Sequence, residues 1–390
     1  MSTAHSPQPP VPKKKRVRSK EKGTPRSKTL SIDLALQGGG SHGAFTWGVL
    51  DRLLEEEDID IQGISGTSAG AMNGAMLVCG MELGGRPGAQ KLLRELWESI
   101  AEIGALYQPF QPMMEKLEEA WAPFDPFAMF RLSPAQLNPF HVNPLRDLLA
   151  RLIDIEALQS SKHMQLFVTA TNVHTGQARV FQCHEVTIDA LMASACLPFV
   201  FEPVQIDGVP YWDGGYVGNP VIWPLIYNTR ASDILLVQIN PLVRETTPSS
   251  MSDIVNRLNE ITFNASLVSE MRAIRFVINL MRENKLDENH YKHILMHRIN
   301  MHDVVGNINA SSKDDTDRDF LRSLHAKGRE AAENWLRDHK QDIGVRETID
   351  IQDTFLAPRP TRQTRRTTST GDKDVDALAA PKLSGGDHRG

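Results

Sequence analysis

The chain has few cysteines, no long apolar run and no cluster of metal-ligating side chains. Only Cys79, Cys183 and Cys196 occur among its 390 residues; an odd number of widely spaced cysteines argues against a disulfide framework and favours a reducing compartment. No run of about 18 apolar residues occurs, so the sequence predicts neither a transmembrane helix nor a signal peptide. No His, Cys or carboxylate cluster has metal-ligand spacing. We therefore expect a cytoplasmic protein that uses no metal or other cofactor.

The composition is that of a globular protein with basic ends. Hydrophobic residues make up 41% and charged residues 23% of the chain, with a formal net charge of −5, which disfavours collagen-like, coiled-coil and disordered classes. Residues 1–28 carry a charge of +8 and residues 357–390 carry +3, so the remainder carries −16. Both ends are poor in large apolar residues and cannot offset the entropy cost of ordering. We predict disordered tails at 1–28 and 346–390 around one folded domain, 29–345. The basic first tail favours peripheral contact with anionic membrane, and no specific nucleic-acid partner is predicted.

Short apolar strands alternate with helical periodicity along the folded part. A strand at 30–36 ends in glycines, a helix follows over 44–54, and a second strand at 59–64 leads through another glycine turn into a helix containing Met72. Two consecutive strand-turn-helix units predict parallel strands joined by right-handed crossovers. Further strands are predicted at 165–171, 178–182, 209–212, 234–239 and 294–299, with helices near 186–195, 251–282 and 319–339. The sequence therefore predicts one α/β domain with a mostly parallel central sheet flanked by helices.

The stretch from Tyr107 to Phe140 differs from its surroundings. Six prolines interrupt any helical period there, and seven aromatic residues and three methionines supply a large apolar surface. Two interpretations remain open, namely core packing by an irregular insertion and a lid or acyl-chain groove.

A serine in a glycine turn is the first candidate catalytic residue. Gly66, Ser68 and Gly70 fit the pattern G-x-S-x-G at a strand-to-helix turn, where flanking glycines allow the close approach that exposes a serine side chain. The helix amino terminus favours developing negative charge beside Ser68. The alternative is a structural helix-capping serine.

The first glycine turn supplies candidate donors for an oxyanion hole. Gly38, Gly39 and Gly40 can present backbone N–H groups to a substrate, and the amide of Ala69, after the serine, is the usual second donor. The same loop, with Gly43, also fits the dinucleotide pattern G-x-G-x-x-G. That pattern expects a carboxylate near the end of the second strand to hold the ribose, and none lies there. A phosphate or nucleotide ligand on this loop is therefore a less favoured alternative.

A serine nucleophile also needs a base. In the usual α/β-hydrolase order, an acid and then a histidine follow the serine, and Asp213 is followed by several histidines: His290, His293, His297 and His302. In that fold, however, the nucleophile turn comes after several strands, whereas here it follows the second. The topology predicted here is a different one.

Four sequence blocks in order resemble those of patatin-like phospholipases, in particular the bacterial members. The blocks are Gly38 to Gly43, Gly66 to Gly70, Ala193 to Pro198, and Asp213 with Gly214 and Gly215. The resemblance runs from about residue 30 to residue 240 and implies a Ser–Asp dyad without histidine, in which Ser68 is the nucleophile and Asp213 the general base. The chain departs from the family pattern at His42, where Arg or Lys is common.

The resemblance implies a serine lipid acyl hydrolase of the phospholipase A or lysophospholipase type, working through an acyl-enzyme intermediate on a lipid or ester substrate. Hydrolysis of an intracellular storage polyester, or acyl transfer, would use the same residues. A non-catalytic protein that binds a phosphate ligand or nucleotide is the alternative from another class. The oligomeric state and the natural substrate are not predicted.

Overall fold

A computed structural model describes residues 29–107, 143–198, 201–287, 291–306, 308 and 310–357. The predicted tail at 1–28, most of the proline-rich stretch (108–142) and the chain after residue 357 lie outside the described residues. The two interpretations of that stretch therefore stay open.

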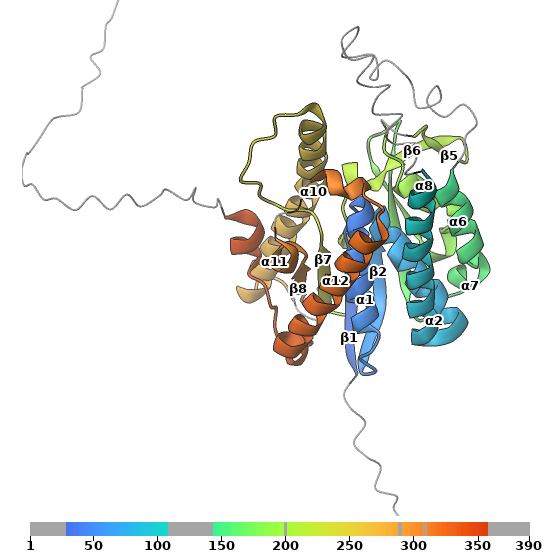
Figure 1. The fold of residues 1–390 in the computed structure, drawn as a ribbon. Helices are drawn as coiled ribbons and strands as arrows, with labels where there is room; N and C mark the ends of the chain where they lie inside the picture. The colour runs from blue at the N-terminus through green and yellow to red at the C-terminus, as the bar shows by residue number, and fades with distance from the viewer. Residues whose placement is uncertain are drawn as a thin grey trace, which may run out of the picture. The chain divides into compact units, whose positions relative to one another are not determined.

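A mostly parallel sheet forms the centre of the fold (Figure 1). The strands follow the order β5-β6-β3-β2-β1-β7-β8, and β4 pairs with β3. The pairs β8–β7, β7–β1, β1–β2 and β2–β3 are parallel, whereas β4, β5 and β6 form antiparallel pairs beside β3. The strand bounds are β1 Leu30–Leu36, β2 Ile59–Gly66, β3 Gln165–Asn172, β4 Ala178–Gln182, β5 Val204–Ile206, β6 Val209–Asp213, β7 Asp233–Gln238 and β8 Leu295–Asn300.

Helices cover both faces of this sheet. Two adjacent helices, α1 (Gly43–Leu53) and α12 (Arg318–His339), pack on one face with α2 (Ala69–Tyr107), which kinks at Gly84 and Gly85. The other face is covered by α9 (Trp223–Asn228) and α10 (Met251–Arg282). The remaining α-helices are α6 Pro144–Leu152, α7 Ile155–Gln159, α8 Ile188–Ser194 and α11 His302–Val305. The short helical turns are η1 Gly40–His42, η3 Cys183–Glu185, η4 Gly214–Tyr216, η5 Ala310–Asp314, η6 Lys340–Asp342 and η7 Gln352–Leu356.

The alternation of side chains along the central strands separates two apolar cores. In β1, Leu34 and Leu36 belong to the core shared with α1, α2 and α12, whereas Ala35 belongs to the core shared with α9 and α10. All six residues of β7 are buried. Apolar side chains on both faces of a strand are typical of parallel sheets covered by helices on both sides, which is why β7 appears in the sequence as a short continuous apolar run.

The predicted fold class is confirmed, and most predicted elements agree with the observed ones within two residues. The C-terminal boundary at residue 345 is too early, because Thr348 N–H donates to Met296 O and both Ile351 and Phe355 are buried. This packing extends the domain at least to residue 356. None of the helices in the described ranges is long and apolar enough to span a membrane.

Candidate active site

The serine turn lies between β2 and α2, at the carboxyl edge of the parallel strands. Ser68 has a φ of 53°, a left-handed backbone conformation that is strained for a residue with a side chain. Its N–H donates to Ser194 Oγ at 2.9 Å, and Thr67 Oγ1 donates to Gly218 O at 2.8 Å. These two contacts tie the turn to α8 and to the loop after β6. The half-buried Ser68 side chain faces Asp213, and its hydroxyl lowers the pKa of that carboxyl group.

Asp213 ends β6 and is only 2% exposed. Its Oδ1 accepts the N–H of Gly215 at 2.7 Å. Its backbone is also held, because its N–H donates to Cys196 O at 2.8 Å and its carbonyl accepts Thr171 Oγ1 at 2.7 Å. Burial raises the pKa of Asp213 from 3.8 to about 7, while the hydrogen bonds from Gly215 and Ser68 oppose that rise. A carboxylate with a pKa near neutrality, facing a serine hydroxyl, is suited to accept a proton.

The glycine loop after β1 lies against the serine turn, but its first amide is already occupied. A Cβ on Gly38 would come within 2.7 Å of Ser68 Cβ, so only glycine fits there. The Gly38 N–H donates to Asn219 Oδ1 at 2.6 Å, which corrects the expectation that it faces an oxyanion. Among the described residues, the amides of Gly39, Gly40 and Ala69 make no hydrogen bond as donors, so these three stay candidate donors.

The other motif glycines allow backbone segments to meet closely. A Cβ on Gly70 would lie 2.2 Å from Leu36 O, so the start of α2 can lie directly on the end of β1 only with glycine there. Similar close approaches occur at Gly43, Gly66, Gly214 and Gly215, where a Cβ would come within 2.1–2.7 Å of a neighbouring atom. These residues pack the loops around the site.

None of the described histidines is hydrogen-bonded to Ser68. His297 bonds to Asp233 and Thr348, and His302 bonds to Gly306 O. His293 is exposed at the opposite edge of the sheet, and His290 lies outside the described residues. Among the described residues, Ser68 interacts with Asp213 and with no histidine, an arrangement that fits a dyad better than a histidine triad.

His42 is buried beneath the glycine loop. Its Nε2 lies 2.8 Å from Ser312 Oγ, and burial, reinforced by the charge of Lys313, lowers its pKa to about 3. The imidazole is therefore neutral near pH 7, and His42 does not supply the positive charge that Arg or Lys would supply at this position.

Sequence reasoning missed a group of buried side-chain amides around the glycine loop: Gln37, Asn219, Asn240 and Asn264. Gln37 Oε1 accepts the N–H groups of Ile239 and Asn240 at 3.0 and 2.9 Å, which joins β1 to the end of β7. Asn219 and Asn240 bond to Gly38. A usable signal was available, since Gln37 directly follows β1 and Asn240 lies two residues after the end of β7, at the edge where such folds place their sites.

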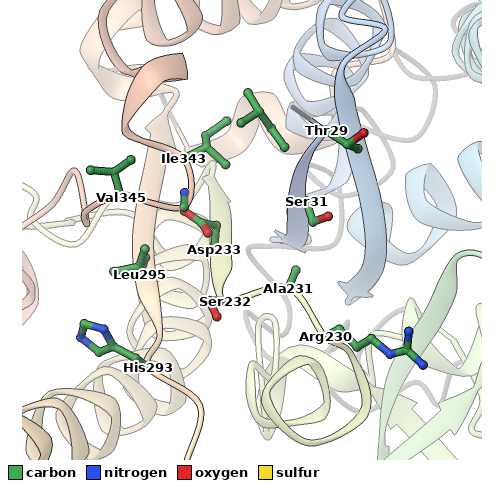
Figure 2. A pocket seen from close by; sticks show the side chains of 12 residues that line it. Thr29, Ser31, Arg230, Ala231, Ser232, Asp233, His293, Leu295, Ile343 and Val345 are labelled. Atoms are coloured by element: carbon green, nitrogen blue, oxygen red, sulfur yellow. The ribbon is translucent and has the colours of Figure 1, made fainter. Parts of the chain in front are cut away.

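A separate pocket of about 400 Å³ opens at the opposite edge of the sheet, where β1, β7 and β8 begin (Figure 2). Arg230, Asp233 and His293 are among the residues that line it. The Asp233 carboxylate already accepts His297 Nε2 at 2.9 Å and Gly344 N–H at 2.8 Å. A seven-residue strand separates this edge from the serine by about 20 Å, so the pocket is no part of the candidate active site. Within the described ranges, no group of three or more His, Cys, Asp or Glu side chains could hold a metal ion.

The geometry defines an α/β protein with a serine in a strained strand-to-helix turn, an adjacent glycine loop and a buried carboxylate. Residues 34–226 match the family model described as patatin-like phospholipase. This match to a patatin-like phospholipase domain supports hydrolysis of lipid esters in general.

Solved structures give a more distant likeness. VipD from Legionella pneumophila is 15% identical with a TM-score of 0.38, and the match covers 84% of this chain and 73% of that one. ExoU, in its heterodimeric complex with SpcU from the type III secretion system of Pseudomonas aeruginosa, is 17% identical with a TM-score of 0.34. That match covers 80% of this chain and 52% of the other. The comparison with curated proteins gave no match.

Proposed function

We propose that this protein is a serine acyl hydrolase that cleaves the ester bonds of phospholipids or lysophospholipids with a Ser68–Asp213 dyad. The observation that supports the dyad is the interaction of the strained Ser68 with the Asp213 carboxyl, which is 2% exposed and whose pKa burial raises to about 7. The substrate class is supported by the family match.

In the proposed reaction, Ser68 Oγ attacks the ester carbonyl carbon while its proton passes to the Asp213 carboxylate. The resulting oxyanion is held by backbone N–H groups of the glycine loop and of Ala69. The intermediate then collapses to an acyl-enzyme, and the leaving alcohol takes the proton from Asp213. Water next attacks the acyl carbon and gives its proton to Asp213. Breaking of the acyl–Ser68 bond releases the fatty acid and returns that proton to the serine.

Labelling with a fluorophosphonate probe tests the nucleophile. We expect the wild-type protein to be labelled at Ser68 and to hydrolyse a p-nitrophenyl ester, and we expect Ser68→Ala to do neither while keeping its circular dichroism spectrum. The matched control is Ser161→Ala, which removes another buried hydroxyl, bonded to Met164 O and remote from the site. Hydrolysis by a folded Ser68→Ala variant would refute the proposal, and binding of a phosphate ligand without labelling would favour the non-catalytic alternative.

We also propose that the enzyme works in the cytoplasm and contacts anionic membrane peripherally. The cysteines support the first part, since Cys79, Cys183 and Cys196 are all buried and unpaired. The charge of +8 on residues 1–28 supports the second. Sedimentation with anionic vesicles at low salt should weaken when these residues are deleted, while hydrolysis of a soluble ester should not change.

A further inference from the structure

The carbonyl oxygen of Gly38 is held by two buried side-chain amides. Asn219 Nδ2 donates to it at 3.1 Å and Asn240 Nδ2 donates at 2.7 Å. Both asparagines are fully buried, and together they use the two acceptor positions of this carbonyl.

Further contacts fix which way each amide faces. Asn219 Oδ1 accepts the Gly38 N–H at 2.6 Å, so the nitrogen of the same amide must face the Gly38 carbonyl. Asn240 Oδ1 accepts Lys313 Nζ at 2.8 Å, which likewise turns its nitrogen toward Gly38. The orientation of Asn240 therefore depends on a lysine from η5, outside the residues matched by the family model.

Lys313 extends beneath the glycine loop, where burial lowers the pKa of its amino group and the nearby Glu260 carboxylate opposes that shift. The Lys313 side chain is 13% exposed, and Nζ lies 3.5 Å from Glu260 Oε1. Glu260 is fully buried and also pairs with Arg244 at 2.7 Å. The Lys313 backbone is close as well, because a Cβ on Gly40 would lie 2.4 Å from Lys313 O. The Lys313 amino group is thus held by the Glu260 carboxylate and the Asn240 amide, and its backbone lies against the glycine loop.

The consequence concerns the next amide along the chain. The Gly38 carbonyl and the Gly39 N–H belong to one planar trans peptide and point in opposite directions. The two asparagine amides hold the plane of this peptide, and one of them, Asn240, is itself bonded to the Lys313 amino group. These bonds draw electron density away from the Gly39 N–H, which strengthens this N–H as a hydrogen-bond donor. We propose that Asn240 and Lys313 are positioning residues that aim and polarise the Gly39 N–H as the glycine-loop donor of the oxyanion hole.

This inference rests on the proposed function, and two kinds of variant test it. Asn240→Asp keeps the side-chain shape and a partner for Lys313 but cannot donate to Gly38 O. Lys313→Met removes the charge, and Lys313→Arg restores a cation that can reach Asn240. For Asn240→Asp and Lys313→Met we expect kcat for a soluble ester to fall on the order of 10- to 100-fold, less than or similar to loss of a direct oxyanion donor. KM should stay within about threefold, and Lys313→Arg should recover most of kcat.

A pair of inhibitors separates this role from a merely structural one. A trifluoromethyl ketone adds the Ser68 hydroxyl, forming a C–O bond and a hemiketal oxyanion while the proton passes to Asp213. The corresponding trifluoromethyl alcohol cannot form this adduct. We expect the two variants to weaken inhibition by the ketone at least tenfold and by the alcohol less than threefold, because only the ketone adduct presents an oxyanion.

The matched control is Lys292→Met, since Lys292 also bonds to a backbone carbonyl, Leu225 O at 3.1 Å, but lies away from the glycine loop. It should leave both inhibition constants unchanged. Equal weakening of both inhibitors by folded Asn240→Asp and Lys313→Met variants, or no weakening of either, would overturn the inference and leave the Ser68–Asp213 dyad intact. Hydrolysis by Ser68→Ala would instead overturn the proposed function.

Discussion

Replacing Asp213 by asparagine should abolish activity and stabilise the fold. The asparagine keeps an oxygen that can accept the Gly215 N–H but cannot take the Ser68 proton, so we expect kcat to fall on the order of 100- to 10,000-fold. Stability should change in the opposite direction because the charge of Asp213 is buried. Its pKa is about 7 in the folded protein against an ordinary value of 3.8. At about 1.4 kcal/mol per pH unit, keeping this carboxylate ionised costs the folded state about 4 kcal/mol at pH 8.

The sign of the pH dependence follows from the raised pKa. Below about pH 4 the carboxyl is protonated in both the folded and the unfolded state, and the cost is absent. As the pH rises toward 7, only the unfolded state releases the proton readily, so the native protein loses stability that Asp213→Asn retains. We expect the variant to be more stable than wild type by about 4 kcal/mol at pH 8 and by about 2 kcal/mol at pH 5. Both values are upper limits, because burying the asparagine amide also has a desolvation cost.

Urea unfolding followed by circular dichroism at pH 5 and pH 8, together with ester hydrolysis, measures both effects. The matched control is Asp233→Asn, another buried aspartate, whose carboxylate accepts bonds from His297 and Gly344 and should gain no stability when its charge is removed. If Asp213→Asn were equally stabilised at both pH values, or not at all, the buried carboxylate would not carry the cost assigned to it. Retained activity would remove Asp213 from the proposed dyad.

Three further predictions concern the same site. The kcat/KM for a soluble ester should fall about tenfold per pH unit below about pH 7, because protonated Asp213 cannot accept the serine proton. A kcat/KM that stays constant between pH 5 and pH 8 would contradict the raised pKa of Asp213. His302→Ala should retain most of the activity. His297→Ala should lower the stability of the protein, because His297 bonds to Asp233 and Thr348, but it should leave ester hydrolysis largely intact. A folded variant of either histidine that is as inactive as Asp213→Asn would favour the triad instead. Gly70→Ala should lower the free energy of unfolding, measured in urea titrations, by about 2–4 kcal/mol. The reason is that its Cβ would lie 2.2 Å from the backbone oxygen of Leu36. An effect below about 0.5 kcal/mol would show that α2 can move away from β1.

Local patterns in the sequence were enough to predict the elements and the catalytic candidates. The apolar run of β7 is continuous because both faces of this strand are buried. The helical spacing of α10 and α12 reflects one packed face each. Short glycine motifs identified Ser68 and the loops around it. Where two backbone segments lie so close that a Cβ would not fit, the residue at that position must be glycine. Such requirements belong to a few neighbouring residues, so they can be recognised without knowing the fold.

Only the tertiary structure decided how the glycine loop is used. Gly38 meets Asn219 and Asn240 across 181 and 202 residues of sequence, and Lys313 joins them from η5. No local sequence pattern predicts such contacts, since they depend on the order of strands in the sheet and on where each loop meets the edge of the sheet. The occupied Gly38 amide, the neutral His42 and the raised pKa of Asp213 have the same origin. Each follows from burial and from partners distant in sequence, which the sequence alone does not bring together.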